Sequence, residues 1–334
     1  MANKIKDIDY LGISAYVRAL ENDLLTDDQY EQLISAKSND EVVKLLQSFG
    51  YGELEPTHPE AIDADLVAVR AEALEELGGG MPTPGDLDVF KIKYDYHNVK
   101  ALLKAEAMNV SPGAMLTDLG RVSVEEMFLA HQERDGSNLP GHIDDAAREG
   151  YDILSATRDP QLSDIAVDKW YFVDLLETAE KTGSDFLLGY IRLMIDAANL
   201  RTLVRTLRMS KNADFLRGVL FDGGNTAPEE LLHVSANSGN GLAELYAPTP
   251  LAAAAAAGAK ALSGGLLTEL EKACDDALTA YLDSARLIPF GEAPVLAYLA
   301  ARETEYTNLR IILMGRMAGV PADVIRARLR AGYM

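Results

Sequence analysis

The chain has 334 residues, enough for two or three ordinary domains and a substantial buried core. Its 31 basic and 52 acidic side chains leave a net charge of −21 at pH 7, which would repel nucleic acid and anionic lipid, so we expect no nucleic-acid partner. A single cysteine, Cys274, cannot form an intramolecular disulfide, and the five histidines lack the spacing of metal ligands. Reducing surroundings and no metal site are the expectation.

Helical periodicity runs through most of the chain. The first residues, MANKIKDIDYLG, contain no apolar run of signal-peptide length, which predicts a cytoplasmic protein. Apolar residues then recur at helical offsets over 42–49, 66–77, 90–108, 168–180, 186–209, 266–284 and 294–317. Glycine and proline predict breaks at 78–85, near 139–141, at 221–228 and at 247–250. Strand-like alternation is nearly absent, so the pattern predicts an all-α fold.

The longest apolar stretch, residues 251–267, is mostly alanine and glycine and contains Lys260. Alanine gains little from lipid, and a spanning helix needs about 20 predominantly apolar residues. The stretch therefore predicts a closely packed soluble helix.

An internal repeat is the most informative feature of the sequence. The segments DYHNVKALLK (95–104), DAANLRTLVR (196–205) and EYTNLRIILM (305–314) align without gaps. Upstream of each stands a hydroxyl residue with glutamate three positions later, which predicts helix N-caps at Ser38, Ser123 and Thr226, paired with Glu41, Glu126 and Glu229. Three units in one order predict a triplicated helical body, divided at about residues 1–110, 111–218 and 219–334.

Each repeated segment carries an asparagine at the head of an apolar stripe, and these are Asn98, Asn199 and Asn308. A buried amide must be hydrogen-bonded, so we expect these asparagines to fix each helix against a loop or a neighbouring helix.

Basic residues are concentrated on the repeated helices. Residues 90–108, 186–217 and 302–334 hold 16 of the 31 cations and only 7 of the 52 acids. One interpretation is that these cations pair with acids of neighbouring helices in the same chain. The other is a basic lining for a partner, with candidate residues Lys100, Lys104, Arg201, Arg205, Arg310 and Arg316.

At these residues the sequence resembles the C-subunit family of V-type/A-type ATP synthases, equivalent to the d subunit of vacuolar ATPases. The resemblance covers nearly the whole chain, including VFKIKYDYHNVKALLKAEAM and the region around DAANLRTLVRTLRM. The closing segment, FGEAPVLAYLAARETEYTNLRIILMGRMAGVPADVIRARLRAGYM, is the most specific part. FDGGNTAP, with Asp222 before the paired glycine, departs from the family pattern.

The resemblance implies a funnel of helices with pseudo-threefold symmetry on the cytoplasmic end of the membrane c-ring, which is built of proteolipid. It implies that the D and F proteins of the central stalk dock into the funnel. It further implies a non-catalytic rotor subunit, with no active site and no small-molecule substrate, which transmits torque between ATP chemistry and proton or sodium ion transport.

Motifs for nucleotide chemistry are missing from the sequence, which agrees with a coupling role. No GxxxxGK[ST] loop is present, and GNG at 239–241 lacks both a third glycine and a preceding strand, so we expect no cofactor. Apolar residues near turns, Met81, Leu139 and 287–290, are candidates for ring contact.

Two alternatives remain at this stage. A helical adaptor unrelated to rotary motors would also suit an acidic, repetitive helical chain. An all-α enzyme binding magnesium through Asp144-Asp145 or Asp275-Asp276 would need a further aspartate, where Arg148 and Thr279 stand instead.

Overall fold

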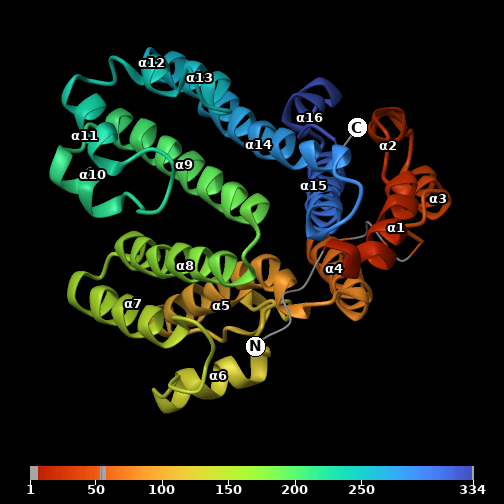
Figure 1. Ribbon diagram of the computed structural model, residues 1–334, viewed down its shortest axis with the longest axis horizontal. Helices are drawn as coiled ribbons and strands as arrows, with labels where there is room; N and C mark the ends of the chain where they lie inside the picture. The colour runs from red at the N-terminus through yellow and green to blue at the C-terminus, as the bar shows by residue number, and fades with distance from the viewer. Residues whose placement is uncertain (1–6, 53, 55–57, 333–334) are drawn as a thin grey trace. The chain divides into compact units, whose positions relative to one another are not determined.

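The computed structural model describes residues 7–52, 54 and 58–332, and every regular element in this part of the chain is helical (Figure 1). The all-α prediction is therefore confirmed. Residues 1–6, where the sequence shows no signal peptide, lie outside the described residues. Within the described part, no helix combines the length and the apolar character needed to cross a membrane.

The chain divides into two compact units. Unit 1 comprises Met1–Pro82, Asp196–Leu220 and Thr226–Met334, and unit 2 comprises Thr83–Ile195 and Phe221–Asn225. The helix α9 (Asp185–Arg208) contributes its first part to unit 2 and its second part to unit 1. The division into three sequence units stays a prediction.

Unit 1 is built around the 26-residue helix α15 (Glu292–Met317), which packs against α1, α2, α4, α14 and α16. Its apolar stripe includes Leu309 and Ile312, which are buried together with Leu33 and Leu46 from the first two short helices after α1. Each such buried leucine or isoleucine stabilises the fold by about 1.5–3 kcal/mol. The helices of unit 1 besides α9 and α15 are α1 (Leu11–Leu20), α2 (Asp27–Ser35), α3 (Asn39–Ser48), α4 (Pro59–Gly80), α10 (Ala213–Val219), α11 (Pro228–Ala236), α12 (Leu242–Tyr246), α13 (Ala252–Leu262), α14 (Leu267–Asp283) and α16 (Ala322–Arg328).

Unit 2 contains four further helices: α5 (Asp88–Met108), α6 (Val124–Glu133), α7 (Ile143–Thr157) and α8 (Pro160–Thr182). The helices α5, α7 and α8 all pack on one another, whereas α6 packs mainly on α5. Gly150 makes the close packing of α7 possible, because a Cβ there would lie 2.7 Å from Leu103 and 2.9 Å from Val167.

Short 3₁₀ turns complete the elements, at Asp7–Tyr10, Glu21–Asp23, Pro84–Leu87, Gly113–Met115 and Ser284–Leu287. The last of these is η5, which leads into the loop before α15.

Two predicted boundaries were wrong. The break expected at 78–85 begins only at Met81, because α4 continues through Gly80, where a Cβ would lie 2.8 Å from Ile13 of α1. The cap expected at Thr226 is one residue off, since Pro228 occupies the first helical position of α11 and the N-cap is Ala227, whose N–H donates to Glu230. Ser38 and Ser123 do cap α3 and α6, accepting the N–H of Glu41 and Glu126.

The side chain of His142, at the start of α7, joins α7 to α8. One ring nitrogen lies 3.2 Å from Asp145 and the other 3.2 Å from Glu177, and the ring stacks on Trp170 with 5.0 Å between centroids. Burial opposes protonation of this ring, but the two carboxylates outweigh burial and raise the pKa of His142 above its ordinary value. The charged ring is therefore favoured in the folded state.

Because Trp170 is the only tryptophan, its fluorescence should report the titration of His142. We expect a midpoint above about 6.5, the value of an unperturbed histidine. The folded pKa is the raised one, so the stabilisation from His142 should be fully present below about pH 6.5 and lost as the pH rises through the folded pKa. His142→Gln should abolish the fluorescence transition and His131→Gln should leave it unchanged. A midpoint at or below 6.5 would contradict the assignment.

Candidate functional site: repeated polar sets on three long helices

Three long helices carry the same set of polar side chains, an acid, an asparagine three residues on and a cation two residues further. We call these the acid–asparagine–cation sets. They are Asp95, Asn98 and Lys100 on α5, then Asp196, Asn199 and Arg201 on α9, and Glu305, Asn308 and Arg310 on α15. In each set the acid and the asparagine are buried, so both need hydrogen-bond partners inside the protein.

The acid of each set accepts a hydrogen bond from a backbone N–H directly before a helix N-cap. Asp95 accepts from Val122 at 3.2 Å, just before the cap of α6, and Asp196 accepts from Thr226 at 2.9 Å, just before the cap of α11. Glu305 accepts from Leu25, just before the cap of α2. Each acid thereby fixes the start of a short helix against a long one.

Arginines complete the surroundings of two of these acids. In unit 2, Arg121 lies between Asp95 and Asp174, with nitrogen–oxygen distances of 2.7 and 2.6 Å. Burial opposes ionisation of Asp174, but the bonds from Arg121 outweigh it and lower the pKa of this carboxyl. In unit 1, Arg302 and the Tyr51 hydroxyl both donate to Glu305, yet burial still raises the pKa of Glu305.

In two of the sets the asparagine side chain binds both polar groups of one backbone residue outside the helices. Asn98 donates to the carbonyl of Thr117 and accepts its N–H, both at 2.9 Å. Asn308 binds Arg330 in the same way, at 3.0 and 2.8 Å. The two amides therefore hold a loop before α6 and the segment after α16.

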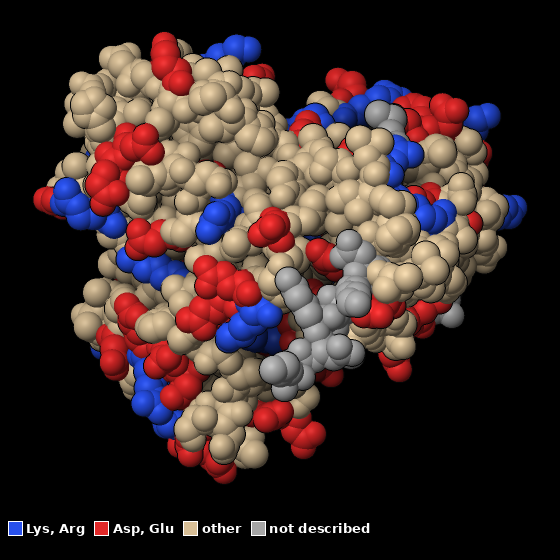
Figure 2. All heavy atoms as spheres, viewed as in Figure 1, with Lys and Arg blue, Asp and Glu red and all other residues tan. Residues whose placement is uncertain are grey.

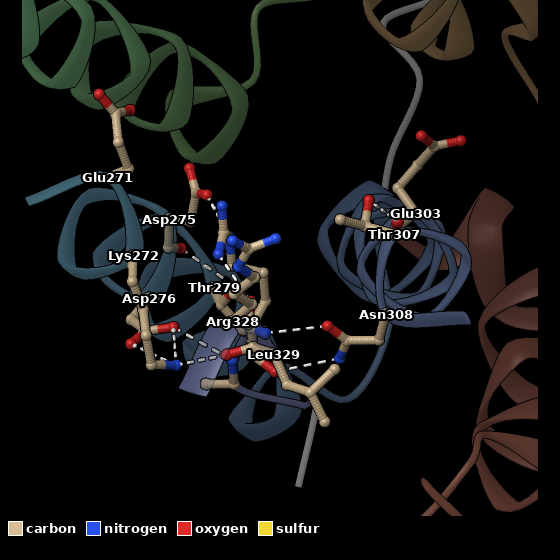
Figure 3. A network of polar contacts seen from close by, with 12 residues as sticks. Glu271, Lys272, Asp275, Asp276, Thr279, Glu303, Thr307, Asn308, Arg328 and Leu329 are labelled. Carbon is tan, nitrogen blue, oxygen red and sulfur yellow. Dashed lines mark hydrogen bonds and ion pairs between the residues drawn. The ribbon is translucent and has the colours of Figure 1, made fainter. Parts of the chain in front are cut away.

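Figure 3 shows how the third set continues into a wider network in unit 1, where α14 faces the segment after α16. Lys272 donates to the carbonyl of Leu329 at 2.6 Å, and Asp276 accepts the N–H of Ala331 at 3.1 Å (Figure 3). Together with the bonds from Asn308, these contacts hold residues 329–331 between α14 and α15.

The six candidate partner-binding cations all have partners within the chain. Lys100 and Lys104 pair with Asp168 and Asp164 of α8, at 2.7 and 2.6 Å. These two pairs join α5 to α8 in unit 2.

The candidate cations of unit 1 follow the same principle. Arg201 and Arg205 pair with α14, at 2.9 and 2.7 Å from Glu271. Arg310 binds Asp63 of α4 at 2.6 Å, and Arg316 donates to the carbonyl groups of residues 34 and 36. On the face drawn in Figure 2, Lys and Arg side chains likewise lie next to Asp and Glu. Pairing with acids of the same chain is thus observed for five of the six, Arg316 binds backbone carbonyl groups instead, and a role toward a partner stays a prediction.

Two residues of this arrangement were missed at the sequence level. Thr26, the cap that corresponds to Ser123, forms a capping box with Gln29 and could have been found by that spacing. Arg121 could not have been found in this way, because it lies outside the repeated segments.

Among the described residues, no group of histidine, cysteine or acidic side chains is arranged to hold a metal ion.

Comparison with known proteins gives a consistent result. The family model for the ATP synthase (C/AC39) subunit matches residues 13–328. The C subunit of the V-type sodium ATPase of Enterococcus hirae is 25% identical over 336 residues, covering 98% of this chain and 99% of the relative. The C subunit of the V-type ATP synthase of Thermus thermophilus is 25% identical over 341 residues, covering 94% and 96%. The C subunit of the A-type ATP synthase of Methanocaldococcus jannaschii is also 25% identical, covering 96% and 86%.

These matches confirm the resemblance found in the repeated segments. They favour a subunit of a rotary ATPase over an unrelated helical adaptor.

The buried acid of unit 2 should matter more for stability than the exposed ion pairs. In Asp95→Asn, a neutral amide would face the Arg121 guanidinium and the Val122 N–H, which now bind a carboxylate. Breaking a buried ion pair such as Asp95–Arg121 costs about 3–5 kcal/mol. We expect a loss of about 3 kcal/mol in the free energy of unfolding, followed through Trp170 fluorescence in urea.

The matched control is Asp164→Asn, whose partner is Lys104 and whose side chain is 31% exposed. It should cost less than about 1 kcal/mol, as exposed pairs do. Equal losses in the two variants would contradict the special role of the buried acid.

Proposed function

The chain belongs to the ATP synthase (C/AC39) subunit family, and from this we propose that it is a non-catalytic central-stalk subunit of a V/A-type rotary ATPase. In this role it links the shaft made of the D and F proteins to the membrane c-ring. It transmits torque for ATP-coupled proton or sodium ion transport. The observation that carries the proposal is the family match over nearly the whole chain.

The acid–asparagine–cation sets support the mechanical part of this proposal. A body that transmits torque must resist deformation, and close-packed helices do so. The buried acids add bonds that fix helix starts and loops to the long helices, so that sliding of one helix on another would break them. Stiffness of this kind is useful in a coupling element.

We further propose that the three sequence units form a funnel with pseudo-threefold symmetry. The order of the acid contacts supports this. Asp95 holds Val122 and Asp196 holds Thr226, each in the following sequence unit, whereas Glu305 holds Leu25 in the first one. This order of contacts is cyclic. In the proposed assembly the chain lies at the cytoplasmic face of the membrane, attached through the c-ring.

Deleting this chain from its host tests whether it couples ATP hydrolysis to ion transport. Membranes prepared without it should lose ATP-driven ion transport, measured with a fluorescent pH or sodium indicator, while the soluble head keeps its ATPase activity. Adding the purified chain back should restore transport. A tagged chain should also co-purify with head proteins, D, F and proteolipid in mild detergent.

Normal ion transport without the chain would overturn the coupling role. Co-purification of D and F without proteolipid would overturn the link to the ring.

We also propose that some of the six candidate cations face the central shaft in addition to their contacts within the chain. Charge swaps test it without breaking the ion pairs. In Asp63→Arg/Arg310→Glu and in Lys100→Asp/Asp168→Lys, each pair is retained but the cation moves to the neighbouring helix. A basic lining predicts at least tenfold weaker binding of a D–F complex, measured by calorimetry. Unchanged affinity in folded variants would leave internal pairing as the whole role of these cations.

A further inference from the structure

Five of the twelve exposed large apolar side chains in the described part of the chain belong to α1, the turn before it and one loop that α1 holds. They are Ile8, Leu11, Tyr16, Leu287 and Phe290, with exposed fractions of 65, 53, 41, 91 and 39%. Single exposed apolar residues are ordinary on a protein surface, but a contiguous group marks an interaction site. Whether these five are contiguous depends on the orientation of α1 and its loop.

The helix α1 is apolar on both sides. Its inner side buries Ile13, Ser14 and Val17, and the helix packs on α15 and α4. The exposed positions 11, 12, 15, 16 and 19 fall on the opposite side, within an arc of about 140° at 100° per residue, and the exposed Ile8 precedes them in the turn η1. None of these six residues is charged, although 25% of the chain is. The outer side of α1 is therefore an uncharged surface that the described part of the chain leaves exposed.

The loop after η5 is fixed along one edge of this surface. The Arg18 guanidinium donates to the carbonyl groups of Ala285 and Ile288, both at 2.9 Å. Ser14 donates to the carbonyl of Gly291 at 3.1 Å and accepts its N–H at 3.3 Å. Leu11, one turn before Ser14 and about 60° round the helix from it, is the exposed residue at the edge of the outer side that lies toward this loop.

The end of η5 and the loop after it therefore present Leu287 and Phe290 beside the exposed side of α1 in a preorganised position. We call Ile8, the five exposed α1 residues, Leu287 and Phe290 together the α1 face.

Gly12, in the middle of the α1 face, points to close approach by another backbone. Inside a helix only proline is less favourable than glycine, and a Cβ at Gly12 would meet no atom within 4 Å. No contact among the described residues therefore requires glycine at this position. Together with Ala15 and Ala19, which are also exposed, it leaves a shallow surface on which a second helix could pack closely.

The border of the α1 face carries more acids than cations, although Arg286 beside Leu287 is exposed and Arg18 lies along the edge next to the loop. Asp9 and Asp23 stand at its two ends, both exposed, and the exposed Glu76 binds the Tyr16 hydroxyl on one flank. This border and the net charge of −21 disfavour anionic lipid and a second copy of the chain. They favour a partner whose own border is basic.

We propose that the α1 face binds an amphipathic helix of a different protein, with an apolar or small-residue contact side bordered by lysine or arginine. The proposed function enters only in naming that protein as another subunit of the rotary ATPase.

The direct test places a photo-cross-linking amino acid at Ala15 of the full chain in its host, with Ala213 on α10 as an equally exposed control. We expect an adduct from position 15 and not from position 213. The cross-linked peptide, sequenced by mass spectrometry, should form a helix with an apolar side and basic borders. An adduct with lipid or with a second copy of this chain, or no adduct at all, would overturn the proposal.

Two further variants separate apolar contact from close approach. Leu11→Asp/Leu287→Asp should reduce recovery of the partner at least tenfold without loss of helical content, since both side chains are exposed. Gly12→Leu should also reduce recovery while thermal stability is kept or raised. Its control is Gly218→Leu on α10, another exposed helical glycine with open space around it. Wild-type recovery in both α1 variants would contradict the proposal.

The two proposals fail in different ways. If the tagged chain does not co-purify with a rotary ATPase but position 15 still cross-links to a basic-bordered helix, the proposed function fails and the α1 face stands. If the chain co-purifies with the ATPase and both α1 variants assemble normally, the α1 face fails and the proposed function stands.

Discussion

The arrangement of this protein depends on burying one carboxylate on each of three long helices. An unpaired buried carboxylate is costly by several kcal/mol, so Asp95, Asp196 and Glu305 each need donors within the fold. The chain supplies a backbone N–H from the residue just before a helix N-cap. The same local signal that starts a short helix thus also fixes that helix to a long one, and local and tertiary structure depend on each other.

The asparagine three residues on strengthens this coupling, because it lies on the same side of the helix and holds a second backbone segment. The cation of each set contributes less. Its ion pairs are partly exposed, and such pairs contribute about 0–1 kcal/mol each. We infer that the buried amide and acid provide the rigidity, while the cations mainly select which acid of the neighbouring helix lies opposite.

The repeated spacing of the asparagines made their burial predictable, because it places each at the head of an apolar stripe. Their partners could not be predicted, since Thr117 and Arg330 lie 19 and 22 residues away in irregular segments. That Gly80 is helical could not be predicted either. The absence of a side chain at Gly80 makes room for Ile13, and this tertiary contact outweighs the low helix propensity of glycine. Part of the α1 face, residues 287–290, was predicted as a contact surface, but residues 11–20 were not among the predicted helical segments, so the sequence could not show which of their side chains share its exposed side.

The distribution of charge connects these features. Five of the six candidate cations on the long helices are paired with acids of the same chain, and Arg18 holds a loop. What remains outward is mostly acidic, apart from the uncharged α1 face. Ion pairs at an exposed border weaken with salt, whereas an apolar helix contact does not depend on it. In the proposed role of transmitting torque, the uncharged surface would therefore be the better attachment, and the charged border would orient the partner.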